Sequence, residues 1–175
     1  MMNIYFNRLF SILAVMGSLA VLSGCSYRFS GTGDMPSGMT RIYVSMIQNY
    51  TSEIGIENYL TDDLINEFIM RRKEVLSRQE DAEGILSGNI EYLRDTPVAH
   101  SSQTKTTQSR VFLGVRLKLV DSKGKTVWAV NGINSNQAYR VTDDKTLTEQ
   151  HKEAAIRVLT KRLAEKIYNR LTDDF

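Results

Sequence analysis

The feature that most constrains the fold is a strict alternation of apolar residues between positions 111 and 119. Val111, Leu113, Val115, Leu117 and Leu119 occupy every second position. Side chains two residues apart in a strand lie on the same face, so this pattern predicts a β-strand with one buried face. The intervening residues are largely polar, which is typical of an antiparallel sheet that is covered on one side only.

Two further strands are predicted around this one. The turn residues Asp121–Gly124 predict a hairpin that leads into a strand from Lys125 to about Arg140. A strand over Gly84–Asp95 precedes it, and we expect it to be interrupted at Thr96-Pro97, because proline cannot donate to a strand ladder. The polar stretch Ala99–Ser109 is then expected to be an exposed loop or the tip of a protruding hairpin.

Apolar residues at helical spacing predict two helices. One runs from about Ile56 to Arg72 and the other from about Leu147 to Leu171. The polar segment 48–53 is expected to be a turn that supplies caps for the first helix from Thr51 and Ser52, and residues 142–144 supply caps for the second. Alternation over Arg41–Ile47 predicts the first strand.

The predicted order is therefore β-α-β-β-β-α. This order predicts an α/β (α+β) two-layer sandwich in which both helices pack on one face of a four-stranded, mostly antiparallel sheet. Residues 41–175 are expected to form this single domain.

The N-terminal residues have the pattern of a cleaved lipoprotein signal peptide, predicted to span residues 1–24. Arg8 precedes the apolar run Leu9–Leu22, which is short for a transmembrane helix of about 20 residues. The run ends in Leu22-Ser23-Gly24-Cys25, the pattern of a bacterial lipobox. The alternative is an ordinary signal peptide or membrane anchor that happens to contain a cysteine.

Cys25 is the only cysteine in the chain, so no disulfide can form within it. We expect Cys25 to carry covalent N-acyl and S-diacylglycerol groups, since two or more acyl chains hold a protein stably at a membrane. Residues 25–40, rich in glycine, serine and threonine, are predicted to be the lipidated tether. Ser26 favours the outer membrane over retention at the inner membrane.

Composition argues against two broad functions. Lysine and arginine number 22 against 20 acidic residues, and this balance does not favour nucleic-acid binding. No phosphate loop or nucleophile motif is present. His100 lies in the polar middle stretch, and His151 lies early in the last predicted helix, where Glu149 and Glu153 two residues away point to different faces. We therefore expect neither an enzyme nor a metal site.

Local basic residues favour an anionic ligand. Lys105 and Arg110 flank the middle loop, and Arg140 and Lys145 lie between the last strand and the last helix. Lysine and arginine at such positions can bind anionic lipid headgroups. The alternative for each residue is an ordinary solvated surface.

Four segments together resemble the LptE family of lipopolysaccharide-assembly lipoproteins. They are Cys25–Phe29 (CSYRF), Ile47–Glu57 (IQNYTSEIGIE), Asp81–Ile90 (DAEGILSGNI) and Leu163–Ile167 (LAEKI). The family start has glycine where this chain has Ser26. The resemblance implies a fold of two helices over a four-stranded sheet, which agrees with the order predicted from periodicity.

The resemblance also implies a function and partners. The protein would be a lipid-anchored plug in the LptD-type outer-membrane barrel, at the periplasmic face, assisting barrel assembly and delivery of lipopolysaccharide to the outer leaflet. Lys105, Arg110, Arg140 and Lys145 are the candidate lipopolysaccharide contacts. The alternative function is a periplasmic lipoprotein that activates a cell-wall synthase, although a tether of about 15 residues spans only about 50 Å.

Overall fold

The computed structural model describes residues 35–101 and 105–173. The predicted signal peptide, most of the predicted tether and Cys25 lie outside the described residues. The elements in chain order are η2 (Pro36–Gly38), β1 (Ile42–Val44), β2 (Gln48–Asn49), α2 (Ile56–Arg72), η3 (Lys73–Val75), η4 (Gln79–Asp81), β3 (Gly84–Ser101), β4 (Lys105–Asp121), β5 (Thr126–Arg140) and α3 (Lys145–Asp173).

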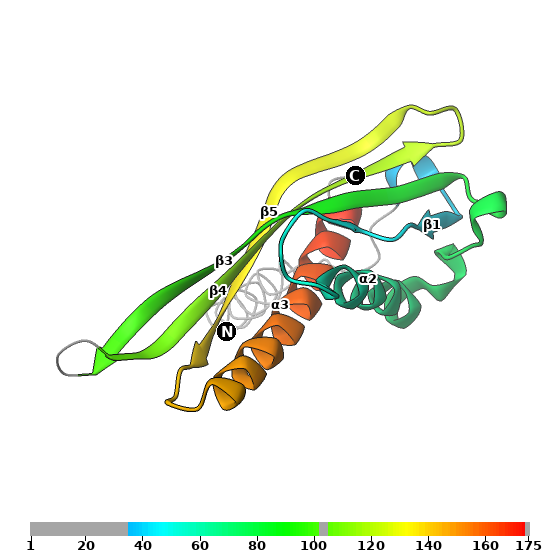
Figure 1. Cartoon of the computed structure of the whole chain (residues 1–175). Helices are drawn as coiled ribbons and strands as arrows, with labels where there is room; N and C mark the ends of the chain where they lie inside the picture. Colours follow the sequence, from blue (N-terminus) through cyan, green and yellow to red (C-terminus); the bar gives the residue numbers. More distant parts are fainter. Residues whose placement is uncertain (1–34, 102–104, 174–175) are drawn as a thin grey trace, which may run out of the picture. The chain divides into compact units, whose positions relative to one another are not determined.

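The strands form one sheet, and both long helices lie on the same face of it (Figure 1). The strand order is β1-β3-β4-β5, and β2 also pairs with β3. The hairpins β3–β4 and β4–β5 are antiparallel, while β1 and β2 pair with β3 in parallel. This arrangement confirms the predicted α/β (α+β) sandwich with two helices on one face of a mostly antiparallel sheet.

The predicted first strand is divided into two pieces. Ser45 still donates its N–H to the carbonyl of Leu86 on β3, at 2.9 Å. Ile47 instead donates its N–H to the hydroxyl of Thr61 on α2, at 3.1 Å. The strand is therefore interrupted at Ile47, whose N–H bonds to helix α2 instead of to β3. Strands β1 and β2 together form one edge of the sheet.

The alternation in β4 packs the core as predicted. Each of its five apolar side chains is at most 1 % exposed. From the helices, Leu64, Phe68, Leu159 and Leu163 are fully buried in the same cluster. The ring of Phe68 meets that of Tyr168 edge-on, with centroids 5.1 Å apart, so α2 and α3 also pack on each other.

The predicted interruption at Thr96-Pro97 was wrong. Strand β3 continues to Ser101, with Pro97 opposite Ser109 and register shifts on either side of Ala99. The short strands β1 and β2 pair only with residues 84–90, so β3 is an edge strand by the time it reaches Pro97. Proline is tolerated at such an edge. The described residues of 99–109 are paired across the β3–β4 hairpin, which agrees with the second of the two predicted alternatives, a protruding hairpin.

The caps of the two helices differ in how well the sequence predicted them. Helix α2 begins after Gly55, whose φ of 90° is left-handed, and neither Thr51 nor Ser52 caps it. Asp144 does cap α3, because its Oδ1 accepts hydrogen bonds from the N–H groups of Thr146 at 2.8 Å and Leu147 at 3.2 Å. Among the described residues, no helix is both long and apolar enough to cross a membrane.

Candidate functional site

The face of the sheet opposite α2 and α3, here called the outer face, carries a series of basic side chains. Residues on β4 that alternate with its buried positions point there, and so do their partners on β3 and β5. The basic residues on this face are Arg94, Arg110, Arg116, Lys118 and Arg140. They make the outer face the strongest candidate for a functional surface.

Arg110 and Arg140 lie diagonally across the β4–β5 pair. Arg110 is opposite Ala138, and Arg140 is opposite Gln108. Residues related in this way lie about 7–8 Å apart on one face. Arg110 is half-buried and its Nε has no hydrogen-bond partner within the described part of the chain, while Arg140 is exposed.

The other two predicted contacts are not brought into this pair. Lys105 is opposite Ser101 near the hairpin tip, five residues from Arg110 and hence about 17 Å along the strand. Lys145 is the first residue of α3 and is exposed. The predicted set therefore divides into an adjacent arginine pair and two separate lysines.

Sequence reasoning missed Arg94, which stacks on an aromatic ring. The guanidinium carbon of Arg94 lies 4.6 Å from the ring centroid of Tyr92. The Tyr92 ring in turn covers Gly114 on β4, where the Cβ of any larger residue would come within 2.3 Å of a ring carbon. The alternation of Tyr92 with Arg94 along the strand predicted over Gly84–Asp95 is the signal that would have found this site.

The remaining basic residues of the outer face lie nearer the β1 edge. Arg116 forms an ion pair with Glu91 at 2.6 Å. Lys118 lines a hollow of about 310 Å³ together with Ser45, Ser87 and Asn89. Hydroxyl, amide and ammonium groups in one hollow suit a polar or anionic ligand.

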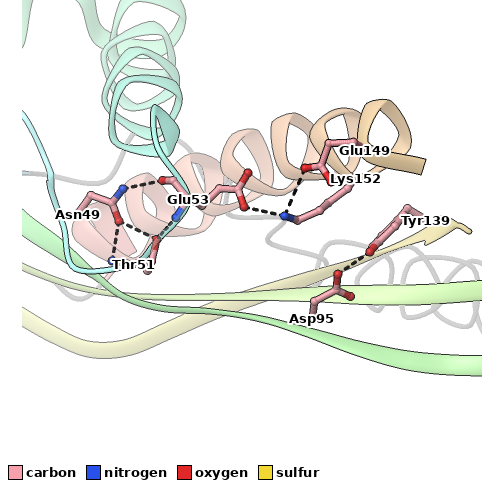
Figure 2. A network of polar contacts seen from close by, with 7 residues as sticks. All are labelled: Asn49, Thr51, Glu53, Asp95, Tyr139, Glu149 and Lys152. Carbon is pink, nitrogen blue, oxygen red and sulfur yellow. Dashed lines mark hydrogen bonds and ion pairs between the residues drawn. The ribbon is translucent and has the colours of Figure 1, made fainter. Parts of the chain in front are cut away.

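On the opposite, helix-facing side, a short hydrogen bond joins β3 to β5. The Tyr139 hydroxyl donates to Asp95 Oδ2 at 2.5 Å, across β4 (Figure 2). Burial, together with the hydrogen bond and charge of Asp95, raises the pKa of Tyr139 to about 12. At the residue after Tyr139, the carbonyl oxygen of Arg140 lies 3.0 Å from His151 Nδ1, so α3 also contacts the end of β5.

The basic side chains of the outer face can bind and position an anion, but they do not form an acid–base pair. Guanidinium and ammonium groups supply donors only. Within residues 35–101 and 105–173, no three metal-ligating side chains converge. The ring of His151 faces a backbone carbonyl, and the side chain of His100 lies outside the described part of the chain.

A family model decides the identity of the fold. The model of the LptE family, described as lipopolysaccharide-assembly, matches residues 39–171. This chain belongs to the LptE family. No curated protein matches it. LptE proteins are non-enzymatic lipopolysaccharide-assembly lipoproteins, which agrees with the expectation that this protein is not an enzyme.

Several solved lipoproteins share the LptE-like fold. Lipoprotein B from Nitrosomonas europaea is 14 % identical with a TM-score of 0.59, over 85 % of this chain and 90 % of that one. The rare lipoprotein B from Shewanella oneidensis is 10 % identical with a TM-score of 0.54, over 75 % and 95 %. A minor lipoprotein from Acinetobacter baumannii is 13 % identical with a TM-score of 0.51, over 77 % and 92 %.

One of the segments that resembles the LptE family has a visible structural role. Glu83, in the segment 81–90, accepts hydrogen bonds from the backbone N–H of Thr40 at 2.8 Å and from the Thr40 hydroxyl at 3.1 Å. These bonds lower the pKa of Glu83 and join the start of β1 to the start of β3. Glu83 in this segment thus holds two strand starts together.

Proposed function

We propose that this protein is the lipid-anchored LptE component of the lipopolysaccharide translocon, at the periplasmic face of the outer membrane. Residues 1–24 are removed, Cys25 carries the N-acyl and S-diacylglycerol groups, and residues 25–40 tether the domain. The domain plugs an LptD-type barrel, assists its assembly and aids delivery of lipopolysaccharide to the outer leaflet. The match of the LptE family model to residues 39–171 carries this proposal.

The outer face supports a direct role for lipopolysaccharide. The phosphate groups of lipopolysaccharide are anionic, and arginine binds phosphate through two parallel hydrogen bonds. Arg110 and Arg140 lie close enough to contact one phosphorylated headgroup, and the stacked Arg94 and Tyr92 add a flat surface on the same face. The role is non-catalytic, because binding and positioning are all that these groups supply.

Copurification from membranes tests the proposed partnership. The full-length chain, expressed in its own bacterium with a C-terminal affinity tag, is extracted in mild detergent and purified. We expect a large, heat-modifiable β-barrel protein in a one-to-one ratio, identified by mass spectrometry as an LptD-type barrel. Recovery of a cell-wall synthase in that ratio would instead support the alternative function and overturn the plug.

A further inference from the structure

The segment 49–57, which joins β2 to α2, is held by hydrogen bonds from every second residue. Asn49 donates through Nδ2 to the carbonyl of Glu53 at 2.7 Å and to the carboxylate of Glu57 at 2.8 Å. The Oδ1 of Asn49 accepts from the N–H and hydroxyl of Thr51, at 2.9 and 2.8 Å. The Thr51 hydroxyl accepts from the Glu53 N–H at 3.2 Å, so the chain is fixed over one short loop (Figure 2).

The same alternation continues into the helix and across to α3. Glu57 accepts from the N–H of Gly55 at 3.1 Å. Glu53 forms an ion pair with Lys152 of α3 at 2.7 Å, and the Lys152 side chain is 19 % exposed. The pair lies partly away from water, where an ion pair is screened less than at the surface. The 49–57 segment is therefore anchored at both ends and at its centre.

The residues between these anchors point large apolar groups into water. Ile54 is 95 % exposed and Tyr50 is 69 % exposed. A flexible loop could fold such side chains back on the protein, but this segment is held by the bonds above. An isoleucine fixed almost fully in solvent is a favourable contact for a partner, since its burial costs little further ordering.

A cavity beside Ile54 indicates the chemistry of that partner. It has a volume of about 220 Å³, lies between the 49–57 segment and α3, and its lining includes Glu53, Glu149 and Glu153. Its other walls are apolar or aromatic, and no basic side chain of the described residues lines it. Lys152 pairs with both Glu53 and Glu149, and Arg157 pairs with Glu153. Two cations thus offset three carboxylates, and one negative charge remains.

We propose that the 49–57 segment is a docking site for a protein segment that places an apolar side chain against Ile54 and a lysine or arginine in the adjacent cavity. The inference rests on the proposed function, in which that protein is the barrel partner. It assigns the contact to a loop on the helix-facing side, whereas the proposed lipopolysaccharide contacts lie on the outer face. A partner can therefore occupy this loop while the outer face holds ligand.

The test compares single variants of the full-length, lipidated chain in the copurification described above. Ile54→Ala removes the apolar contact, and Glu149→Lys reverses a charge at the cavity. Met70→Ala, on α2 and 67 % exposed, is the control for loss of an exposed apolar side chain. Lys161→Glu, on the exposed side of α3, is the control for charge reversal.

We expect Ile54→Ala and Glu149→Lys each to lower the recovered barrel at least about 10-fold, a change that corresponds to about 1.4 kcal/mol. Both controls should recover the barrel as the unaltered chain does, and all four should melt within a few degrees of it. A photo-crosslinking residue at position 54, but not at position 70, should join the chain to the barrel.

The outcomes separate the two proposals. If the unaltered chain recovers the barrel and the two variants recover it equally well, the docking site is wrong and the proposed function stands. A crosslink from position 54 to a second copy of this chain, or to lipid alone, also overturns the docking site. If the unaltered chain recovers no barrel, the proposed function fails and the docking site fails with it.

Discussion

At the scale of single residues, the arginine pair on the outer face makes a direct prediction. Arg110→Ala with Arg140→Ala should weaken binding of purified lipopolysaccharide at least about 10-fold, because two phosphate-binding groups that share one face are lost. Isothermal titration measures the affinity. The charge-matched control is Lys73→Ala with Lys161→Ala, which removes two exposed cations from the helix-facing side. Equal binding by both double variants would remove the pair from the proposal.

A second residue-scale prediction concerns the contact of Tyr92 with Gly114. Gly114→Ala should destabilise the fold by about 1–3 kcal/mol, because the new methyl group would collide with the Tyr92 ring. Urea unfolding measures the loss. In the background of Tyr92→Ala the same substitution should cost much less, since the obstructing ring is gone. A cost that is the same in both backgrounds would contradict the contact.

The hydrogen bond between Tyr139 and Asp95 predicts a pH dependence. The pKa of Tyr139 is about 12 in the folded protein and near 10 when exposed, so folding favours its protonated form. This contribution to the free energy of unfolding is complete below pH 10 and is lost as the pH rises through about 12.

Ultraviolet difference absorbance of tyrosinate checks the pKa of Tyr139. Tyr139→Phe should remove a transition near pH 12, and the stability of that variant should fall less between pH 10 and pH 12. Tyr50→Phe, at an exposed tyrosine, should leave both properties as they are. A Tyr139→Phe protein with an unchanged high-pH transition would show that the hydrogen bond is absent in solution.

At the scale of elements, the cap of α3 depends on one carboxylate. Asp144→Ala should lower the free energy of unfolding by about 1 kcal/mol, because two backbone N–H groups lose their acceptor. Asp144→Asn keeps a capping oxygen and should cost only a few tenths of that. Thermal melts of the two variants compare the effects directly. Equal melting temperatures would indicate that Asp144 does not cap the helix.

The elements also show where local sequence stops being sufficient. The alternation of β4 and the apolar stripes of α2 and α3 were predicted correctly, because a buried face repeats with the period of the element that carries it. The break predicted at Pro97 rests on a missing backbone donor, which is a local property of proline. A backbone donor at position 97 is needed only if a neighbouring strand pairs with that side of β3. Strands β1 and β2 pair only with residues 84–90, so none is needed there.

At the scale of the whole molecule, the lipid on Cys25 is expected to anchor the protein in addition to the proposed barrel. Cys25→Ala should abolish labelling by radioactive palmitate, because the thiol that accepts the acyl chains is lost. Immunoprecipitation followed by autoradiography measures the label. Ser26→Ala is the control and should remain labelled. An unaltered protein that takes up no label would identify the N-terminal segment as an ordinary signal peptide or anchor.

The sequence by itself determined the element types, the layer of helices on one face and the LptE resemblance, since periodicity and short motifs are encoded along the chain. Only the tertiary structure decided which basic residues share a site. Arg110 and Arg140 are 30 positions apart, and their approach depends on the register of the β4–β5 hairpin. A slip of one residue would turn one of them to the helix side, so adjacency across strands is a property of pairing rather than of sequence spacing.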